Sequence, residues 1–273
     1  MQTEEKLLYR DVGRGPTVVL LHDFPLTPEL WDQQAQALQD AGFRVILPDL
    51  STLQTAGSIP HYARRVIALL NRLGLGRVAV CGMGMGGAIL FDLLERHAQR
   101  IAGACFIATR PVPDDIQERA RRAELVKSLL KEDAAAVREE LLRMLLSGRE
   151  KPLPERLQRA VRKMVCSYDR NVLINGLNAM AQRKDYTPLL DQLQLPTLVL
   201  GGEHDDISHP QHVTIMAAAL PCCRGAQKLD AGHLVPLERP QEVNALLVDF
   251  FRSIAPRHAA MEYRAKDELR LAS

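Results

Sequence analysis

The sequence of 273 residues has few aromatic residues, no strong charge of either sign and no apolar run long enough to cross a membrane. Aromatic side chains make up only 4% of the chain, and the formal net charge at pH 7 is +2. A nearly balanced charge gives no indication of nucleic-acid binding. The first nine residues include acidic side chains and lack the apolar segment of a secretory signal. We therefore expect a cytoplasmic protein that does not associate with membranes.

The chain also lacks a disulfide framework. Its five cysteines are odd in number and irregular in spacing, and the adjacent Cys222 and Cys223 would form at most a strained bridge. Cys81 lies inside an apolar run, where a buried thiol is normally inert. We do not expect it to act as a nucleophile.

The composition, with 47% hydrophobic and 25% charged residues, is typical of a globular protein, and the length suits one α/β domain. Short apolar runs alternate with segments of helical periodicity, which predicts a mostly parallel sheet covered by helices on both faces. The predicted strands are Val18–Leu21, Arg44–Leu47, Val78–Cys81, Ala104–Ala108, Thr197–Leu200 and Gln227–Leu229. The predicted core helices are Pro28–Ala41, His61–Leu73, Met85–His97, Gln211–Leu220 and Gln241–Ile254.

Residues 111–188 break this alternation, because they contain helical patterns and no strand-like run. We expect them to form a helical cap inserted into a core of residues 1–110 and 189–257, followed by a C-terminal extension at 258–273. The predicted cap helices are Glu118–Leu130, Ala134–Leu146, Glu155–Ser167 and Val172–Gln182. The candidates for lining an apolar pocket under this cap are Leu141, Leu145, Met164 and Met180. Apolar residues at helical spacing also pack helices onto a core, so both interpretations stay open.

The segment Val80–Gly87 has the pattern of a nucleophile elbow whose nucleophile is missing. In a G-x-S-x-G elbow, serine sits on a sharp turn between a strand and a helix, with glycines on either side for clearance. This chain has Gly84 at the central position. Glycine has no side chain to attack a carbonyl group, so the segment cannot support ordinary serine hydrolysis.

Three other strand ends carry residues suited to the same site. Asp205 follows the apolar run at Thr197, and His233 lies in a glycine-containing loop after the run at Gln227. His22 and Asp23 follow the first apolar run, where a backbone N–H group can complete an oxyanion hole. The chain order of nucleophile position, acid and histidine is the order used by α/β-hydrolases.

Together these motifs resemble the α/β-hydrolase superfamily, and most closely its small carboxylesterases of the pimeloyl-carrier methyl esterase type, from about Leu8 to about Ile254. The resemblance implies that Asp205 is the acid of a triad and His233 its general base. It also implies that the N–H groups of Phe24 and Met85 form the oxyanion hole, and that His22 and Asp23 border the pocket.

The chain departs from the family pattern at three places. Gly84 replaces the serine, Asp23 replaces a glycine, and residues 50–55 replace an Arg-Gly-x-Gly stretch. A carboxylate at Asp23 disfavours a nearby oxyanion unless it points away or is paired.

Three functions remain open from the sequence. The first is a hydrolase of weak activity in which water fills the space left by the serine side chain and His233 acts as base. The second is a serine esterase in which Gly84 is a replacement that disables the nucleophile. The third is a non-catalytic protein that binds a small molecule. We expect an acyl or ester compound as ligand, although Arg110, Arg183 and Lys184 near the cap boundaries equally favour an anionic one.

Two alternative sites are weaker. Gly82-x-Gly84-x-x-Gly87 matches a dinucleotide-binding loop, with Arg110 placed to hold a 2′-phosphate, but no acidic residue ends the next strand. The segment 204–212 contains three histidines and two aspartates without the spacing of a metal site. We expect neither a cofactor nor a metal.

Overall fold

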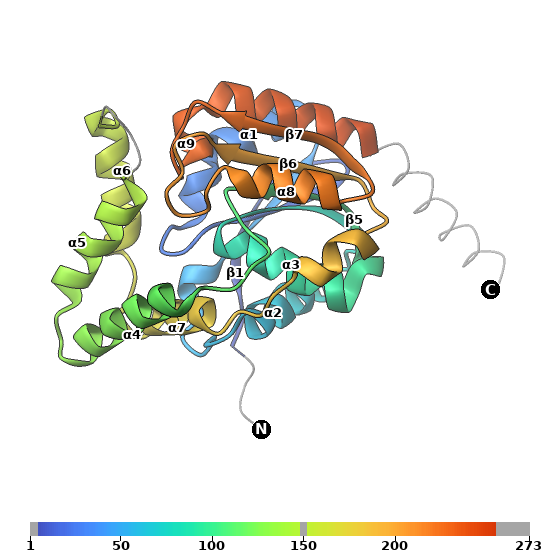
Figure 1. Cartoon of the computed structure of the whole chain (residues 1–273). Coiled ribbons are helices and arrows are strands. Elements are labelled where there is room, and N and C mark those ends of the chain that lie inside the picture. The colour runs from blue at the N-terminus through green and yellow to red at the C-terminus, as the bar shows by residue number, and fades with distance from the viewer. Residues whose placement is uncertain (1–4, 148–151, 255–273) are drawn as a thin grey trace.

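The computed structural model describes residues 5–147 and 152–254, in which seven strands form one sheet of order β1-β3-β2-β4-β5-β6-β7 (Figure 1). The strands are β1 (Leu8–Gly13), β2 (Thr17–Leu21), β3 (Arg44–Asp49), β4 (Val78–Met83), β5 (Ile101–Ile107), β6 (Thr197–Gly202) and β7 (Cys223–Leu229). All neighbouring strands except β1 and β3 pair in parallel. The predicted α/β fold with a mostly parallel sheet is confirmed.

The edge strand β1 is the one strand of this sheet that the sequence analysis missed. It pairs antiparallel with β3, and most of its side chains are exposed. An exposed edge strand does not need an apolar run, so it gives no hydrophobic signal. The strands β4, β5 and β6, by contrast, are buried along their whole length and appear in the sequence as continuous apolar runs.

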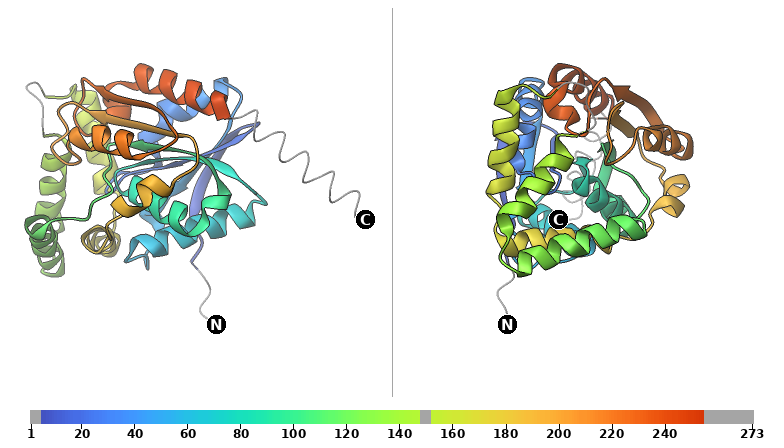
Figure 2. Two further views of the ribbon diagram at one scale, coloured as in Figure 1. Left: turned by 45° about the vertical axis from the view of Figure 1, so that its right-hand side comes forward. Right: turned by 60° about the vertical axis from the view of Figure 1, so that its left-hand side comes forward.

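Helices cover both faces of the sheet (Figures 1 and 2). One face carries α1 (Asp32–Asp40) and the helix formed by residues 240–254, which are joined by a hydrogen bond of 3.0 Å from Gln34 Nε2 to Asn244 Oδ1. The other face carries α2 (Ile59–Arg72), α3 (Met85–His97) and α8 (Gln211–Ala219). The helix predicted from Pro28 begins instead as a 3₁₀ turn before α1. Within the described residues, no helix is long and apolar enough to span a bilayer.

Four helices between β5 and β6, which we call the cap, lie at one end of the sheet (Figures 1 and 2). They are α4 (Ile116–Leu130), α5 (Ala134–Leu145), α6 (Glu155–Cys166) and α7 (Arg170–Ala181). Tyr168 holds the cap to the loop after β2, because its hydroxyl donates to the Leu26 carbonyl and its ring packs edge-on against Phe24 at 5.6 Å. The predicted extension at 258–273 lies outside the described residues.

Candidate functional site

The candidate site lies at the carboxyl ends of four strands. Asp23 follows β2, Gly84 follows β4, Asp205 follows β6 and His233 follows β7. Parallel strands of one sheet end at a common edge, where ligands of open α/β sheets bind. The sheet order therefore brings together residues that are up to 210 positions apart in the chain.

The elbow keeps its shape without a serine. Gly84 has φ 49° and ψ −113°, a left-handed conformation that strains every residue except glycine. A Cβ atom on Gly86 would lie 2.2 Å from the Leu21 carbonyl oxygen, so only glycine lets α3 pack this closely against β2. Thr109 fixes the turn by donating from its hydroxyl to the Gly84 carbonyl at 2.9 Å.

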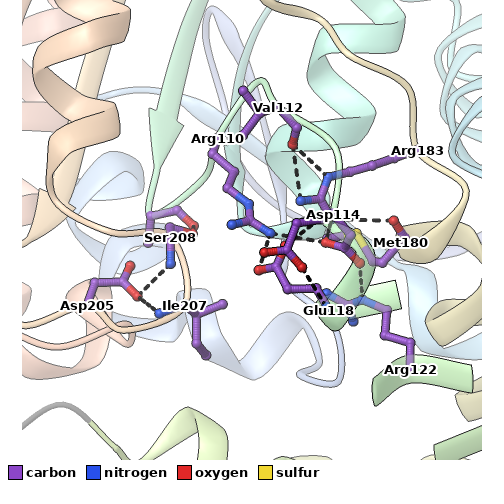
Figure 3. A network of polar contacts seen from close by, with 12 residues as sticks. Arg110, Val112, Asp114, Glu118, Arg122, Met180, Arg183, Asp205, Ile207 and Ser208 are labelled. Carbon is purple, nitrogen blue, oxygen red and sulfur yellow. Dashed lines mark hydrogen bonds and ion pairs between the residues drawn. The ribbon is translucent and has the colours of Figure 1, made fainter. Parts of the chain in front are cut away.

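Asp205 and His233 form a buried pair, each only 2% exposed. Nδ1 of His233 lies 2.9 Å from Oδ2 of Asp205. The other carboxylate oxygen, Oδ1, accepts hydrogen bonds from the backbone N–H groups of Ile207 and Ser208 (Figure 3). Burial raises the pKa of Asp205, but the bonds from His233 and the two N–H groups outweigh it, and the net shift is downward. The carboxylate of the next residue, Asp206, is exposed.

Asp23 occupies the space into which a serine at the elbow would project. Its Oδ1 accepts a hydrogen bond of 2.6 Å from the Met85 N–H group, and its Oδ2 lies 3.1 Å from Nε2 of His233. A Cβ atom on Gly84 would lie only 2.0 Å from Asp23 Oδ1. The two departures from the family pattern at positions 23 and 84 thus compensate each other sterically.

The sequence predicts Asp23 at the border of the pocket but does not predict this contact with Met85 and His233. The available signal was the joint presence of a carboxylate where glycine is usual and of glycine where serine is usual. Either change alone suggests only that a functional residue has been lost. The two changes together indicate that the side chain at position 23 fills the space left by the missing serine side chain at position 84.

His22 supports the loop that carries Asp23. The Leu50 N–H group donates to Nε2 of His22 at 2.9 Å, so the ring proton resides on Nδ1 and is donated to the Asp23 carbonyl oxygen, also at 2.9 Å. The ring is fully buried, and this burial lowers the pKa of His22. A neutral His22 therefore fixes the backbone at Asp23.

His233 is held between two carboxylates. Burial lowers its pKa, but Asp205 and then Asp23 outweigh burial and raise the pKa to about 10. At neutral pH the ring is therefore an imidazolium that donates from both nitrogens. In this state His233 does not act as a base.

We expect Asp23→Asn to lower the pKa of His233 from about 10, because one of the two stabilising carboxylates is removed. NMR titration of protein with ¹³C-labelled histidine measures this value directly. Asp206→Asn, which removes an exposed carboxylate near the site, is the matched control and leaves the pKa unchanged. An equal pKa in the parent and in Asp23→Asn would contradict the assigned contact.

The same pKa predicts a loss of stability in alkali. The folded pKa of His233 is raised above its ordinary value of 6.5, so its contribution is complete below about pH 6.5 and disappears as the pH rises through about 10. Thermal unfolding from pH 6 to 10.5 should show this decline, and Asp23→Asn should make it shallower. Parallel curves for the two proteins would contradict the assignment.

A cavity of about 370 Å³ opens beside Asp23, Gly84 and His233. The predicted residues that line it are Asp23, Phe24, Gly84, Leu141, Leu145, Met180 and His233. Met164 is buried in α6 and His22 lies behind the Asp23 loop, and neither is among the described residues that line the cavity. The cavity also contains five arginines, namely Arg110, Arg121, Arg122, Arg143 and Arg183.

The alternative sites gain little from the geometry. The N–H group of Met85, where a dinucleotide pyrophosphate would bind, already donates to a carboxylate. Cys81 is fully buried in β4. Among the described residues, the metal-ligating atoms that cluster within 4.8 Å belong to the exposed Glu203, His204 and Asp230, and Asp23, Asp205 and His233 are not part of this cluster.

Comparison with known proteins agrees with this architecture. Residues 16–240 match the family described as alpha/beta hydrolase fold. The structure is similar to that of an esterase from Thermogutta terrifontis solved with malate bound, with a TM-score of 0.84 and 31% identity over 91% of this chain and 94% of that one. The pimeloyl-[acyl-carrier protein] methyl ester esterase of Aromatoleum aromaticum is 27% identical over 87% of this chain and 98% of its own length.

A third relative, bifunctional epoxide hydrolase 2 of Sus scrofa, is 20% identical over 92% of this chain. The chain spans about half the length of that protein and of its Rattus norvegicus counterpart, with 54% of each covered.

Proposed function

Because this chain belongs to the family with the α/β-hydrolase fold, we propose that it is a hydrolase in which the carboxylate of Asp23 attacks the substrate in place of an elbow serine. The observation that carries the proposal is the position of that carboxylate. It lies at the mouth of the elbow, between Met85 N–H and His233, and it borders the cavity.

The hydrogen bond from Met85 decides which kind of substrate suits this site. In a serine esterase this N–H group would stabilise the oxyanion of an attacked ester. Here it donates to Asp23 Oδ1 instead. An ester carbonyl attacked by water would lack that donor, whereas an ester formed on Asp23 itself would have its own carbonyl oxygen already in place. The arrangement therefore favours an alkyl electrophile over an acyl one.

In the first step, Asp23 Oδ2 attacks the electrophilic carbon of R–X. A carbon–oxygen bond forms, the carbon–X bond breaks, and X leaves with the bonding pair as an anion. The product is an alkyl ester of Asp23, which carries no charge. Loss of that charge lowers the pKa of His233, because one of the two groups that raise it is gone. His233 then releases its proton to solvent and becomes a base.

In the second step, His233 takes a proton from water through Nε2 while the hydroxyl oxygen adds to Cγ of Asp23. The negative charge develops on Oδ1, 2.6 Å from the Met85 nitrogen in the resting site. Collapse breaks the bond between Cγ and the alkyl oxygen, which receives the proton from His233. The new carboxyl group then protonates His233, and Asp23 and the imidazolium are restored.

The similarity to an epoxide hydrolase supports attack on an alkyl carbon, while the similarity to esterases supports the hydrolysis of an ester, here the one formed on Asp23. The water-mediated esterase and the disabled serine esterase are less consistent with the occupied Met85 N–H group and with the overlap between Asp23 and a side chain at position 84. A non-catalytic binding protein is the second candidate, because the ion pair between Asp23 and His233 itself fills the elbow.

The test measures whether an oxygen atom from water enters the Asp23 carboxylate. Single turnover of 6-bromohexanoate, 1-bromobutane or styrene oxide in H₂¹⁸O should place ¹⁸O in the Asp23 carboxylate, detected by peptide mass spectrometry. The His233→Gln variant should retain one alkyl group on Asp23, because alkylation proceeds and hydrolysis stops. Asp206→Asn is the control and should behave like the parent. Ligand binding without label or adduct would instead favour the non-catalytic candidate.

A further inference from the structure

Three arginines that line the cavity surround one buried carboxylate (Figure 3). Asp114 is buried, and its carboxylate lies 2.8 Å from Arg183 Nη1, 2.5 Å from Arg122 Nε and 3.1 Å from Arg110 Nη2. Arg110 Nη2 also bonds to Glu118 at 2.5 Å. We call these five residues the arginine cluster. Its three guanidinium groups share two carboxylates, so the cluster has a net charge of +1.

Some N–H donors of the cluster form no hydrogen bond among the described residues. Arg183 is occupied, because it donates to the carbonyl oxygens of Val112 and Met180 in addition to Asp114. Among the hydrogen bonds of the described residues, Arg110 donates only from Nη2 and Arg122 only from Nε. The side chains of these two arginines are 12% and 17% exposed, and both line the cavity. Guanidinium groups in such positions are suited to bind a carboxylate with two parallel hydrogen bonds.

The cluster starts beside the catalytic groups. Thr109, whose hydroxyl bonds to the Gly84 carbonyl, immediately precedes Arg110. Burial lowers the pKa of Arg183 to about 10 against the attraction of Asp114, with Arg110 and Arg122 adding repulsion. The positive charge of the three guanidinium groups is thus only partly compensated by the carboxylates of Asp114 and Glu118.

The opposite sign prevails at the strand-end site. Asp23 repels an anion there, and both ring nitrogens of His233 already face carboxylates. The cavity also has apolar lining residues, among them Phe24, Leu141 and Met180. An amphiphilic ligand therefore has one favourable orientation, with its acidic group away from Asp23.

We propose that the cavity binds substrates that carry a carboxylate, and that Arg110 and Arg122 hold this group while the apolar remainder extends toward Asp23. The assignment of this ligand as a substrate rests on the proposed function. The binding itself does not, because it needs no turnover. Lys184, the other cation near the cap boundary, bonds to Glu95. Neither Lys184 nor Glu95 lines the cavity.

Calorimetric titration with 4-phenylbutyrate, and with its neutral analogue 4-phenylbutyramide, tests the proposal on the full chain. We expect the acid to bind at least about tenfold more tightly than the amide, with an affinity that falls as salt is added. Arg110→Gln should reduce the affinity for the acid about tenfold or more and leave that for the amide unchanged. Arg143→Gln is the matched control, because Arg143 lines the same cavity but is exposed and paired with Glu140.

A second variant protects the test against misfolding of Arg110→Gln. Glu118→Gln removes a carboxylate that competes for Arg110, so it should tighten binding of 4-phenylbutyrate, a gain that a merely structural role does not produce. Equal binding of acid and amide, or full affinity in a folded Arg110→Gln protein, would overturn the proposal. If acid binding follows these expectations but Asp23 is never labelled, the proposed function fails and the carboxylate site stands. If Asp23 is labelled but the acid has no advantage, the reverse holds.

Discussion

The double variant Gly84→Ser/Asp23→Gly is expected to hydrolyse p-nitrophenyl acetate at least about 100-fold faster than the parent, whereas Gly84→Ser alone is not. A hundredfold change corresponds to about 2.7 kcal/mol of activation free energy. The double variant has a serine beside the His233–Asp205 pair, and the Met85 N–H group is available for the ester oxyanion. These are the parts that serine esterases need.

The single variants separate the two causes. In Gly84→Ser the new Cβ atom would lie 2.0 Å from the Asp23 carboxylate in the parent geometry. Asp23 must therefore break its hydrogen bonds with Met85 and His233, while its negative charge stays near the oxyanion hole. In Asp23→Gly the space is open but no nucleophile fills it. The gain should therefore be strongly non-additive, as a double-mutant cycle measures. Equal rates for Gly84→Ser and the double variant would contradict the steric coupling of positions 23 and 84.

The sequence predicts most of the sheet, because its central strands are buried on both faces and appear as uninterrupted apolar runs. The exposed edge strand β1 lacks this signal and was missed. The predicted helix boundaries agree with the structure within a few residues where proline or a polar cap marks them. The helix predicted at 118 begins two residues earlier, at Ile116, after the capping box formed by Asp115 and Glu118.

The site was predictable in part for a similar reason. Asp205 and His233 each follow a recognisable strand, and parallel strands bring their carboxyl ends together, so their contact follows from chain order. The contact between Asp23 and His233 depends on a side-chain direction and on the absence of a Cβ atom 61 residues further along, at Gly84. No periodicity encodes such a relation. The arginine cluster is harder still, since its members lie in β5's exit loop, in α4 and after α7.

Replacing Asp114 with asparagine is expected to destabilise the protein by about 3–5 kcal/mol, the usual cost of removing one partner from a buried ion network. Asp114 is buried, and its loss leaves Arg183, whose side chain is 3% exposed, without the carboxylate that compensates its charge. Urea unfolding at pH 7 measures the change. Glu140→Gln is the control, because Glu140 pairs with the exposed Arg121 and Arg143, and such surface pairs contribute about 0–1 kcal/mol.

The pH dependence of that difference identifies its electrostatic part. Burial raises the pKa of Asp114, but Arg122 and Arg183 outweigh it and bring the pKa below the ordinary value of 3.8. The stabilisation is therefore complete above about pH 3.8 and is lost as the pH falls through the lower folded pKa. The curves of parent and Asp114→Asn should converge in acid. A gap that persists at low pH would mean that packing around Asp114, rather than its charge, holds the first turn of the cap to the rest of the protein.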